Sequence, residues 1–512
     1  MNFTITLTDE QNNAILHDTG NLIVIACAGS GKTTVITRRL ARLIRDGLAE
    51  PEEIVAFTFT VKAAEHMKNE IIGLLDDKND ISKMFVGTIH AYCLKILKEY
   101  YPDISEYYNV IDEDQQFMIF YQNYHYWKLD KLSDERKKDA IDRVIASMNL
   151  IKTERSLNVK EVQKKQPLLW DICLKYNEYL DQSRSFDYSD LLLRVNERLE
   201  KDARFRDYVN SRCRYLIVDE YQDIDNLQEN IIQLISGKQN VCVVGDDDQS
   251  IYQFRGTNVL NMINFSSRYG AAEYPLSENR RSGKNILDLA NELIGHNQNR
   301  IDKEMKGNKE GGIVQIRRFS SIGDEVKWIV DEIKKLNGQG IPCSEIAILL
   351  RSVSGGGSGS NDFKNNGEIY IEGLKGANIP YVAKGDCGLF KTPEIITIYS
   401  IFEYLIQKED SCIIFDKLNV GLAFIEVLKT RKDLSANLSK NELLKLGARE
   451  NEAEILSKLI ALRDEYIRSR YDSISDLFFR ILNLMEMLRG PDAMKLRNLG
   501  EFSNLIRKFV CV

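Results

Sequence analysis

Residues 26–33 read Ala-Cys-Ala-Gly-Ser-Gly-Lys-Thr and combine the groups needed to hold a triphosphate. A glycine-rich turn that opens a helix directs backbone N–H groups at phosphate oxygens, and Lys32 supplies a mobile positive charge beside them. The hydroxyl of Thr33 is a ligand type that Mg²⁺ accepts in such a loop. The strict pattern begins with Gly where this sequence has Ala26. The alternative interpretation is an ordinary glycine-rich turn.

Two acidic residues, Asp219 and Glu220, directly follow the apolar run at residues 215–218. At the end of a strand beside the loop, Asp219 would hold a metal ion and Glu220 would polarise an attacking water. An Asp-Glu pair alone is also common at a solvated strand end. Its combination with the loop favours a site for nucleotide hydrolysis.

Short apolar runs alternate with helical patterns around these residues. Strands are predicted over residues 21–26, 53–59, 215–218 and 241–244, with helices over residues 33–45 and 62–75. This order predicts an α/β fold with a parallel sheet covered on both faces. From about residue 100 to residue 185 the pattern is helical and polar, which indicates a helical domain inserted into the α/β domain.

A second α/β segment is predicted to begin near residue 279. Its expected strands cover residues 313–316 and 346–350, around a helix over residues 324–336. The Gly/Ser/Asn-rich residues 352–367 read as a flexible loop, either a natural insertion or an engineered linker. After about residue 393 the pattern is helical again.

Bulk composition excludes several classes of protein. A chain of 512 residues is too long for one core, so roughly two to four domains are expected. The nine cysteines include no Cys-x-x-Cys pair, which favours reduced thiols in a cytoplasm over disulfides or a zinc site. We find no secretory signal and no apolar run of the roughly 20 residues that would cross a membrane. The net charge of −7 argues against a nucleic-acid coat but permits a local basic groove.

Further motifs resemble those of superfamily 1A DNA helicases of the UvrD/Rep/PcrA family, in the family's order. The matching segments are residues 7–11 (Q motif), 58–64 (Ia), 87–90 (Ib), 219–223 (II), 245–256 (III) and 279–282 (IV). The resemblance implies ATP and Mg²⁺ as cofactors and 3′-to-5′ movement along single-stranded DNA. It also implies single-strand/double-strand DNA junctions as partners and a role in DNA repair.

The same resemblance implies a RecA-like P-loop motor domain, an inserted helical domain, a partial second RecA-like domain and a helical accessory domain. The implied boundaries are 1–105 and 186–278 for the first motor domain, 106–185 for the insertion, 279–392 for the second motor domain and 393–512 for the accessory domain.

The resemblance assigns an ATP site to residues from the phosphate loop and from four further motifs. Its nucleotide contacts are Gln11, Ala28, Gly29, Ser30, Gly31, Lys32, Thr33, Thr34 and Arg281. Its catalytic residues are Lys32, Asp219, Glu220, Gln249 and Arg281, with Mg²⁺ on Thr33 and Asp219. In this assignment Gln249 and Arg281 contact the γ-phosphate; a surface salt bridge is the alternative for Arg281. Arg280 stands where the family has an adenine-stacking tyrosine, so a guanidinium would have to lie on the base.

The resemblance also assigns DNA contacts. They are Thr58, Phe59, Thr60, Thr88, His90, Tyr252, Phe254 and Arg255. Aromatic stacking tolerates any base and contributes about 1–3 kcal/mol per base, which suits a motor that steps along any sequence. The alternative for each aromatic ring is packing in the core. Two minor signals stay open: Cys27 is either a redox-sensitive thiol or a small residue that fits, and the basic clusters 136–138 and 164–165 either touch duplex DNA or are solvated helix faces.

Two later family motifs were not found. Motif V carries Thr-x-His and Lys-Gly, and motif VI a Thr-Arg, whereas the last of the five histidines is His296. We therefore expect a fragment, a split gene or a degenerate motor, with feeble hydrolysis because a lost arginine finger can cost about 10³–10⁵ in rate. Two functions remain: a DNA helicase, or an ATP- and DNA-binding subunit that works with a protein partner in a nuclease-containing recombination or anti-phage complex.

Overall fold

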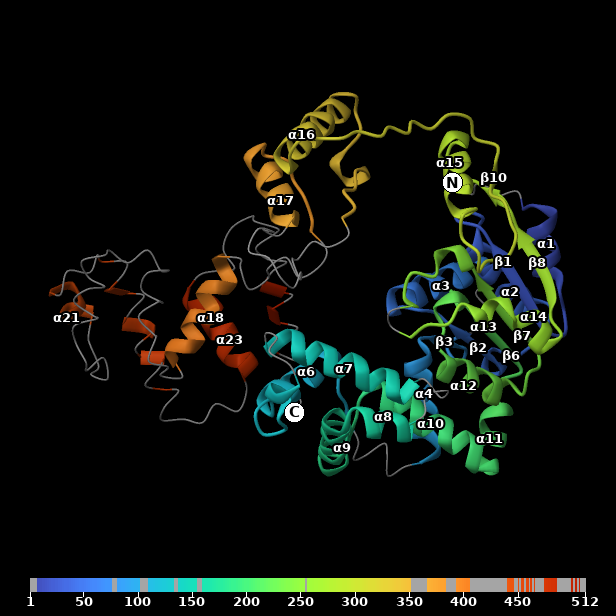
Figure 1. The fold of residues 1–512 in the computed structure, drawn as a ribbon, viewed down its shortest axis with the longest axis horizontal. Coiled ribbons are helices and arrows are strands. Elements are labelled where there is room, and N and C mark those ends of the chain that lie inside the picture. The colour runs from blue at the N-terminus through green and yellow to red at the C-terminus, as the bar shows by residue number, and fades with distance from the viewer. Residues whose placement is uncertain are drawn as a thin grey trace. The chain divides into compact units, whose positions relative to one another are not determined.

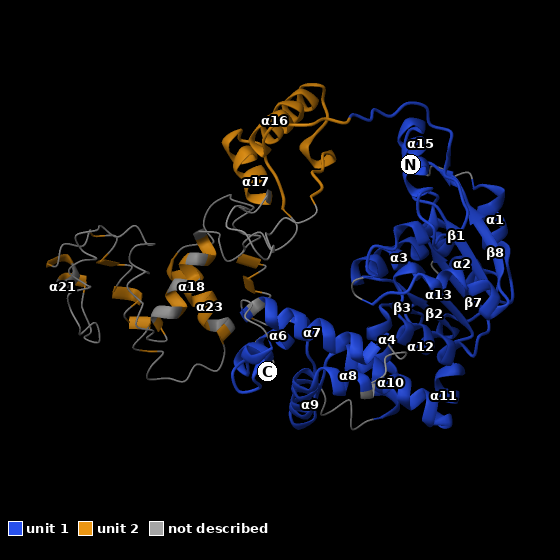
Figure 2. Cartoon of the chain, in the orientation of Figure 1, with its two compact units in different colours: residues 1–315 blue, residues 316–512 orange. Residues whose placement is uncertain are grey.

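The computed structural model describes residues 7–75, 81–101, 109–132, 137–153, 159–253, 256–350, 366–383 and 393–405, and short helical pieces between residues 440 and 506. The chain divides into two compact units, Met1–Gln315 and Ile316–Val512 (Figures 1 and 2). Each unit contains a hydrophobic core of its own.

A six-stranded sheet forms the centre of the first unit, in the order β3-β2-β6-β7-β1-β8. Its strands are β1 (Leu22–Ala26), β2 (Ile54–Phe57), β3 (Phe85–Gly87), β6 (Tyr215–Val218), β7 (Val241–Gly245) and β8 (Ala272–Leu276). All neighbours pair in parallel, which confirms the predicted parallel sheet. Strands β1, β2, β6 and β7 are buried along their whole length, so their sequences are continuous apolar runs rather than alternating ones.

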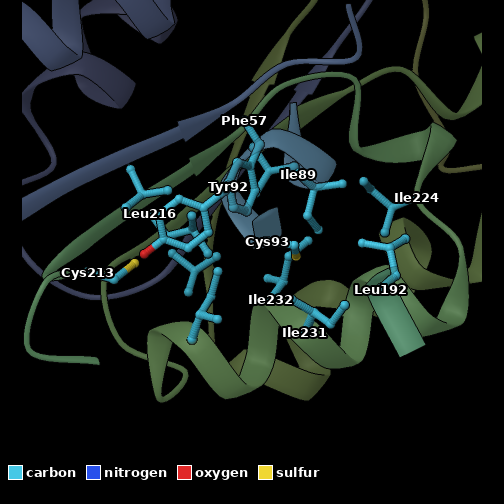
Figure 3. Close-up of a cluster of buried hydrophobic side chains, with 14 of the residues drawn as sticks. Phe57, Ile89, Tyr92, Cys93, Leu192, Cys213, Leu216, Ile224, Ile231 and Ile232 are labelled. Atoms are coloured by element: carbon cyan, nitrogen blue, oxygen red, sulfur yellow. The ribbon is translucent and has the colours of Figure 1, made fainter. Parts of the chain in front are cut away.

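Helices cover both faces of this sheet (Figure 1). They are α1 (Asp9–Leu16), α2 (Lys32–Arg45), α3 (Val61–Leu74), α4 (Ile89–Tyr100), α10 (Tyr188–Lys201), α11 (Ala203–Asn210), α12 (Asn226–Ser236), α13 (Leu260–Ile263) and α14 (Phe265–Tyr269). Alternate residues of each strand point to opposite faces. Leu22 and Val24 therefore join the core under α1, α2 and α3, whereas Ile23 and Ile25 join the core under α4, α10 and α12. Figure 3 shows the second core, in which Phe57 and Tyr92 meet.

The chain between β3 and β6 carries a separate helical cluster. It consists of α6 (Glu113–Gln122), α7 (Lys137–Thr153), α8 (Val159–Lys165) and α9 (Pro167–Gln182), with the two-residue strands β4 (Asn109–Val110) and β5 (Ser185–Phe186). Phe120, Trp127 and Tyr176 lie at the centre of its core. A helical insertion was the expectation for this part of the chain, and the described residues agree with it. Its boundaries stay a prediction.

Two predicted strands are wrong. Residues 313–316 and 346–350 form no strand, and Ile313, Ile316 and Leu349 are 85%, 87% and 92% exposed. A strand exists only when a neighbour accepts and donates its backbone hydrogen bonds, and no described segment pairs with these. The residues after β8 instead form β9 (Glu278–Asn279), the helix α15 (Lys284–Ile294) and β10 (Lys306–Gly307), with β9 and β10 paired in parallel.

The secondary structure described in the second unit is helical. Its helices are α16 (Ile322–Gly338), α17 (Asn366–Gly376), α18 (Pro393–Leu405), α21 (Lys440–Lys445) and α23 (Ile474–Leu484). The predicted helix over residues 324–336 is confirmed as α16, which packs on α17 through Val326, Val330 and Leu374. Of the Gly/Ser/Asn-rich tract, residues 352–365 lie outside the described residues, and the last two begin α17. No described helix is both long enough and apolar enough to cross a bilayer.

Candidate nucleotide and DNA site

The phosphate-loop candidate has the strand–turn–helix setting that its chemistry requires. Buried strand β1 ends at Ala26, and α2 begins at Lys32. Gly29 and Gly31 adopt left-handed φ angles of 68° and 85°, which glycine tolerates best. A Cβ at Gly29 would lie 2.8 Å from the side-chain nitrogen of Asn279, and one at Gly31 would lie 2.8 Å from that of Gln11. Both positions therefore need glycine for conformation and for space.

The side chain of Gln11 is hydrogen-bonded to the phosphate loop. Its Oε1 accepts from the N–H of Thr8 at 3.0 Å, which closes the capping box of α1. Its Nε2 donates to the carbonyl oxygen of Ser30 at 2.9 Å, and the side chain is buried. An amide oxygen has a second lone pair and an amide nitrogen a second N–H, so a contact between Gln11 and adenine does not require these hydrogen bonds to break. The adenine contact stays a prediction.

The two carboxylates after β6 lie at the loop, as the sequence predicted. Lys32 Nζ and Glu220 Oε2 form an ion pair of 2.7 Å. Glu220 has a φ of 50°, and its N–H donates to Asp219 Oδ1 at 3.0 Å. Burial, reinforced by the neighbouring Glu220, raises the pKa of Asp219 to about 6. A cation beside Asp219 would favour its charged form.

A magnesium ion fits the donor groups found here. Mg²⁺ keeps several waters and binds proteins through one or two carboxylates, with substrate phosphates completing its octahedron. Thr33 is the second residue of α2, which follows β1, and Asp219 directly follows β6. Only β7 separates those two parallel strands in the sheet, so one hydroxyl and one carboxylate stand at the same sheet edge.

A chain of hydrogen bonds joins this pair to the motif III segment. Gln222 Nε2 donates to Glu220 Oε2 at 2.9 Å, and Gln222 Oε1 accepts from the N–H of Asp246 at 3.0 Å. Gln249 Nε2 then donates to Asp246 Oδ2 at 2.6 Å. The predicted γ-phosphate sensor Gln249 is thus connected to Lys32 through three intervening residues, with the link to Gln222 made by the backbone N–H of Asp246. Sequence reasoning gave Gln222 and Asp246 no role; Asp246 directly follows β7, and Gln222 lies in the short helix Tyr221–Asp223 after β6.

The segment 279–282 is docked on the phosphate loop. The buried Asn279 donates from Nδ2 to the carbonyl oxygen of Ala28 at 2.6 Å. Its Oδ1 accepts from the N–H groups of Arg281 and Ser282 at 2.9 and 2.8 Å. Arg281 is exposed, and its Cβ would be 3.0 Å from a Cβ at Gly29, so the base of this side chain lies at the loop. It forms no ion pair with any described residue, so the structure does not support the salt-bridge alternative.

Arg280, the residue in place of the stacking tyrosine, has a different environment. Its Nε lies 3.1 Å from Glu278 Oε1 in an ion pair, and its N–H donates to the carbonyl oxygen of Gly29 at 3.1 Å. The backbone of Arg280 therefore helps to hold the loop. Stacking of its guanidinium on adenine stays a prediction; it would use the face of the group, whereas the ion pair uses the N–H edge.

Two of the predicted DNA-contacting rings stack on each other. The ring centroids of Phe59 and Tyr252 are 5.4 Å apart, with an interplanar angle of 20°. Phe59 is 44% exposed, so it is a surface ring and not a core residue. Phe254 and Arg255, which were expected beside them, lie outside the described residues.

The predicted polar DNA contacts have structural partners. Thr60 and Thr88 cap α3 and α4 by accepting from the N–H groups of Ala63 and Ala91. Thr58 is buried, and its hydroxyl donates to the carbonyl oxygen of Thr60 at 3.0 Å. His90 packs edge-on against Tyr188, and burial lowers its pKa to about 4, so its ring is neutral at neutral pH. DNA contacts from these residues stay predictions.

The comparisons with known proteins identify the family of this chain. Residues 7–270 match the UvrD/REP helicase N-terminal domain, and residues 274–511 match the UvrD-like helicase C-terminal domain. The chain belongs to the UvrD/REP helicase family. Both the α/β fold and the motif order predicted from the sequence agree with this membership.

Similar proteins are described as DNA helicases. The chain is 29% identical to the ATP-dependent DNA helicase PcrA of Staphylococcus epidermidis, over 83% of this chain and 58% of that protein. It is 28% identical to the PcrA of Leuconostoc citreum, over 98% of this chain and 69% of that protein. It is also 28% identical to a Rickettsia conorii protein named "Probable DNA helicase II homolog", over 99% and 79%. The matched region thus covers about 58% of the length of the Staphylococcus relative.

The structure shows the surroundings of Cys27 and of two lysines in the basic clusters. Burial, with Asp246 as the next cause, raises the pKa of the Cys27 thiol to about 11, which leaves little reactive thiolate at neutral pH. This favours Cys27 as a small residue that fits. In the basic clusters, Lys137 Nζ lies 3.5 Å from the ring centroid of Tyr121, and Lys165 pairs with Glu161 at 2.6 Å. Both lysines therefore have partners on solvated helix faces.

Proposed function

We propose that this chain binds ATP with Mg²⁺ and couples its hydrolysis to movement along single-stranded DNA. The observation that carries the proposal is the continuous hydrogen-bonded path from Lys32 through Glu220, Gln222 and Asp246 to Gln249. A structural glycine turn needs no such path, whereas a nucleotide sensor does. Family membership and the relatives named as ATP-dependent DNA helicases support the same function.

The residues at the loop would act by exchanging partners. Incoming β- and γ-phosphates would take the Lys32 ammonium from Glu220, and the freed carboxylate would orient the attacking water. Thr33 and Asp219 would hold Mg²⁺, which when bound supplies neutralisation of the phosphate charge. Arg281, exposed beside Gly29, would approach the γ-phosphate.

The stacked pair of Phe59 and Tyr252 would be the DNA contact. A base inserted against either ring would replace ring-on-ring stacking with base-on-ring stacking, which is independent of sequence. We propose 3′-to-5′ movement, single-strand/double-strand junctions as substrates and a role in DNA repair, on the family resemblance. The buried or half-buried free thiols at Cys27, Cys93 and Cys343 support a reducing compartment such as the cytoplasm.

The helicase assignment is preferred to a non-unwinding subunit, since the similar proteins are named as helicases. We propose the same nucleotide contacts and the same domain boundaries that the sequence predicted. That motifs V and VI are lacking stays a prediction, and nucleotide binding is therefore a sharper test than turnover.

Equilibrium binding of a fluorescent ATP analogue tests the proposal. Lys32→Ala removes a charge-assisted contact, so affinity should fall by about tenfold or more. Lys309→Ala, an exposed lysine in the same unit, is the matched control and should bind as the unsubstituted chain does. Equal binding by Lys32→Ala and the unsubstituted chain would show that the nucleotide site has been placed wrongly.

A further inference from the structure

The acidic run Asp246–Asp248 is clamped by two basic residues from the segment between α15 and β10. Lys303 Nζ lies 3.0 Å from Asp246 Oδ1 and 3.1 Å from Asp248 Oδ2, and it also contacts Asp247. Arg300 forms two bonds of 2.9 Å with the carboxylate of Asp248. Nothing in the motif assignments gives these basic residues a role.

The clamp formed by Lys303, Arg300 and the run Asp246–Asp248 is largely buried. The side chain of Lys303 is 7% exposed, and that of Asp247 is 0% exposed. Asp247 also accepts from the N–H of Ile301 at 2.7 Å, which fixes the backbone of the clamp segment. Burial alone would lower the pKa of Lys303, but the three carboxylates outweigh it and raise that pKa, so the ammonium stays charged. Three acidic neighbours without Lys303 would repel one another in a poorly solvated site.

The clamp acts on the same carboxylate that orients Gln249. Asp246 Oδ1 accepts from Lys303 and from the N–H of Asp248 at 3.2 Å, while Asp246 Oδ2 accepts from Gln249 Nε2 at 2.6 Å. Fixing Oδ1 therefore fixes Oδ2, and with it the direction of the Gln249 amide. A side chain held in one orientation before a ligand arrives loses less conformational entropy on binding.

We propose that Lys303, supported by Arg300, is a positioning residue that aligns Gln249 for recognition of the γ-phosphate. The inference rests on the proposed function of this site as an ATP site. Lys303 does not touch the nucleotide in this proposal; it acts through Asp246. The segment after α15 thus becomes part of the nucleotide sensor, although it is far from motif III in the sequence.

The test compares affinities for ADP and for a non-hydrolysable ATP analogue with an imido bridge between its β- and γ-phosphates. A hydrogen bond to a charged group corresponds to a preference of about 10- to 150-fold. Lys303→Met should lose most of the preference for the analogue while keeping its ADP affinity. Lys306→Met, the same substitution at an exposed lysine three residues later, should keep the preference.

A second pair of variants separates positioning from stability. Lys303→Met leaves excess negative charge, so Lys303→Met/Asp247→Asn should recover stability by removing one buried carboxylate. If Lys303 positions Gln249, this double variant folds but still lacks the preference, because Asp246 has no ammonium. Recovery of the preference together with stability would overturn the proposal, as would a full preference in Lys303→Met.

A third experiment measures whether the effects of substituting Lys303 and Gln249 are additive. Gln249→Ala alone should lower the preference by the same factor as Lys303→Met, and combining the two should lower it no further, since residues that act as one unit are not additive. Additive losses would overturn the proposed route through Gln249. An unsubstituted chain that binds both nucleotides equally would overturn the inference alone, whereas one that binds neither would overturn the proposed function itself.

Discussion

Replacement of Asn279 should disconnect the segment 279–282 from the phosphate loop. The side chain makes three hydrogen bonds: one to the carbonyl oxygen of Ala28 at 2.6 Å and two from the N–H groups of Arg281 and Ser282 at 2.9 and 2.8 Å. Each hydrogen bond contributes about 0.5–1.5 kcal/mol net, so Asn279→Ala should lower the free energy of unfolding by roughly 1.5–4.5 kcal/mol. The upper part of that range is expected because the site is buried and the abandoned groups cannot all reach water.

Urea unfolding followed by circular dichroism, together with ADP affinity, measures this prediction. Asn285→Ala is the matched control, because that exposed asparagine makes a single bond to the carbonyl oxygen of Gly312 at 2.9 Å. Its effect should stay within about 0.5 kcal/mol. Asn279→Asp keeps the two turn bonds but opposes an oxygen to the carbonyl of Ala28, so it should weaken ADP binding more than its stability loss implies. If Asn279→Ala is no less stable than Asn285→Ala, Asn279 does not hold the loop.

Three further predictions follow from the same contacts. Because the folded pKa of Asp219, about 6, lies above its ordinary value of 3.8, ionisation opposes folding and stability falls as the pH rises from about 4 to about 6. Asp219→Asn should therefore be more stable than the unsubstituted chain at pH 7, with the difference closing by pH 4; a difference independent of pH would contradict this. Phe59→Ala should weaken binding of labelled oligo-dT by about 1–3 kcal/mol, whereas Tyr126→Ala, 79% exposed in the helical cluster, should not. Lys152→Met breaks the buried 2.8 Å pair with Asp187 and should destabilise the first unit by about 3–5 kcal/mol in urea; a loss below 1 kcal/mol would refute that.

Local patterns in the sequence were sufficient for the four inner strands of the first unit's sheet, β1, β2, β6 and β7, but not for the edge strands β3 and β8. Strands β1, β6 and β7 are continuous apolar runs because a parallel sheet covered on both faces buries every residue. The loop before α2 was recognisable because glycine, lysine and threonine at fixed spacing serve a local geometry. The same reasoning failed at residues 313–316 and 346–350, since an apolar run has the composition of a strand but cannot supply its own pairing partner.

Only the tertiary structure decided which residues of the site form hydrogen bonds and ion pairs with one another. Gln222 lies in the turn after β6 and Asp246 directly follows β7, and their contact depends on β6 and β7 being neighbours in the sheet. Lys303 reaches Asp246 only because β10 pairs with β9 beside the loop, a register that no local pattern encodes. Sequence determines which side chains are able to bind phosphate, because that chemistry depends on residue type and short spacing. Which of these side chains form ion pairs and hydrogen bonds with one another depends on distances between segments that the chain brings together only when it folds.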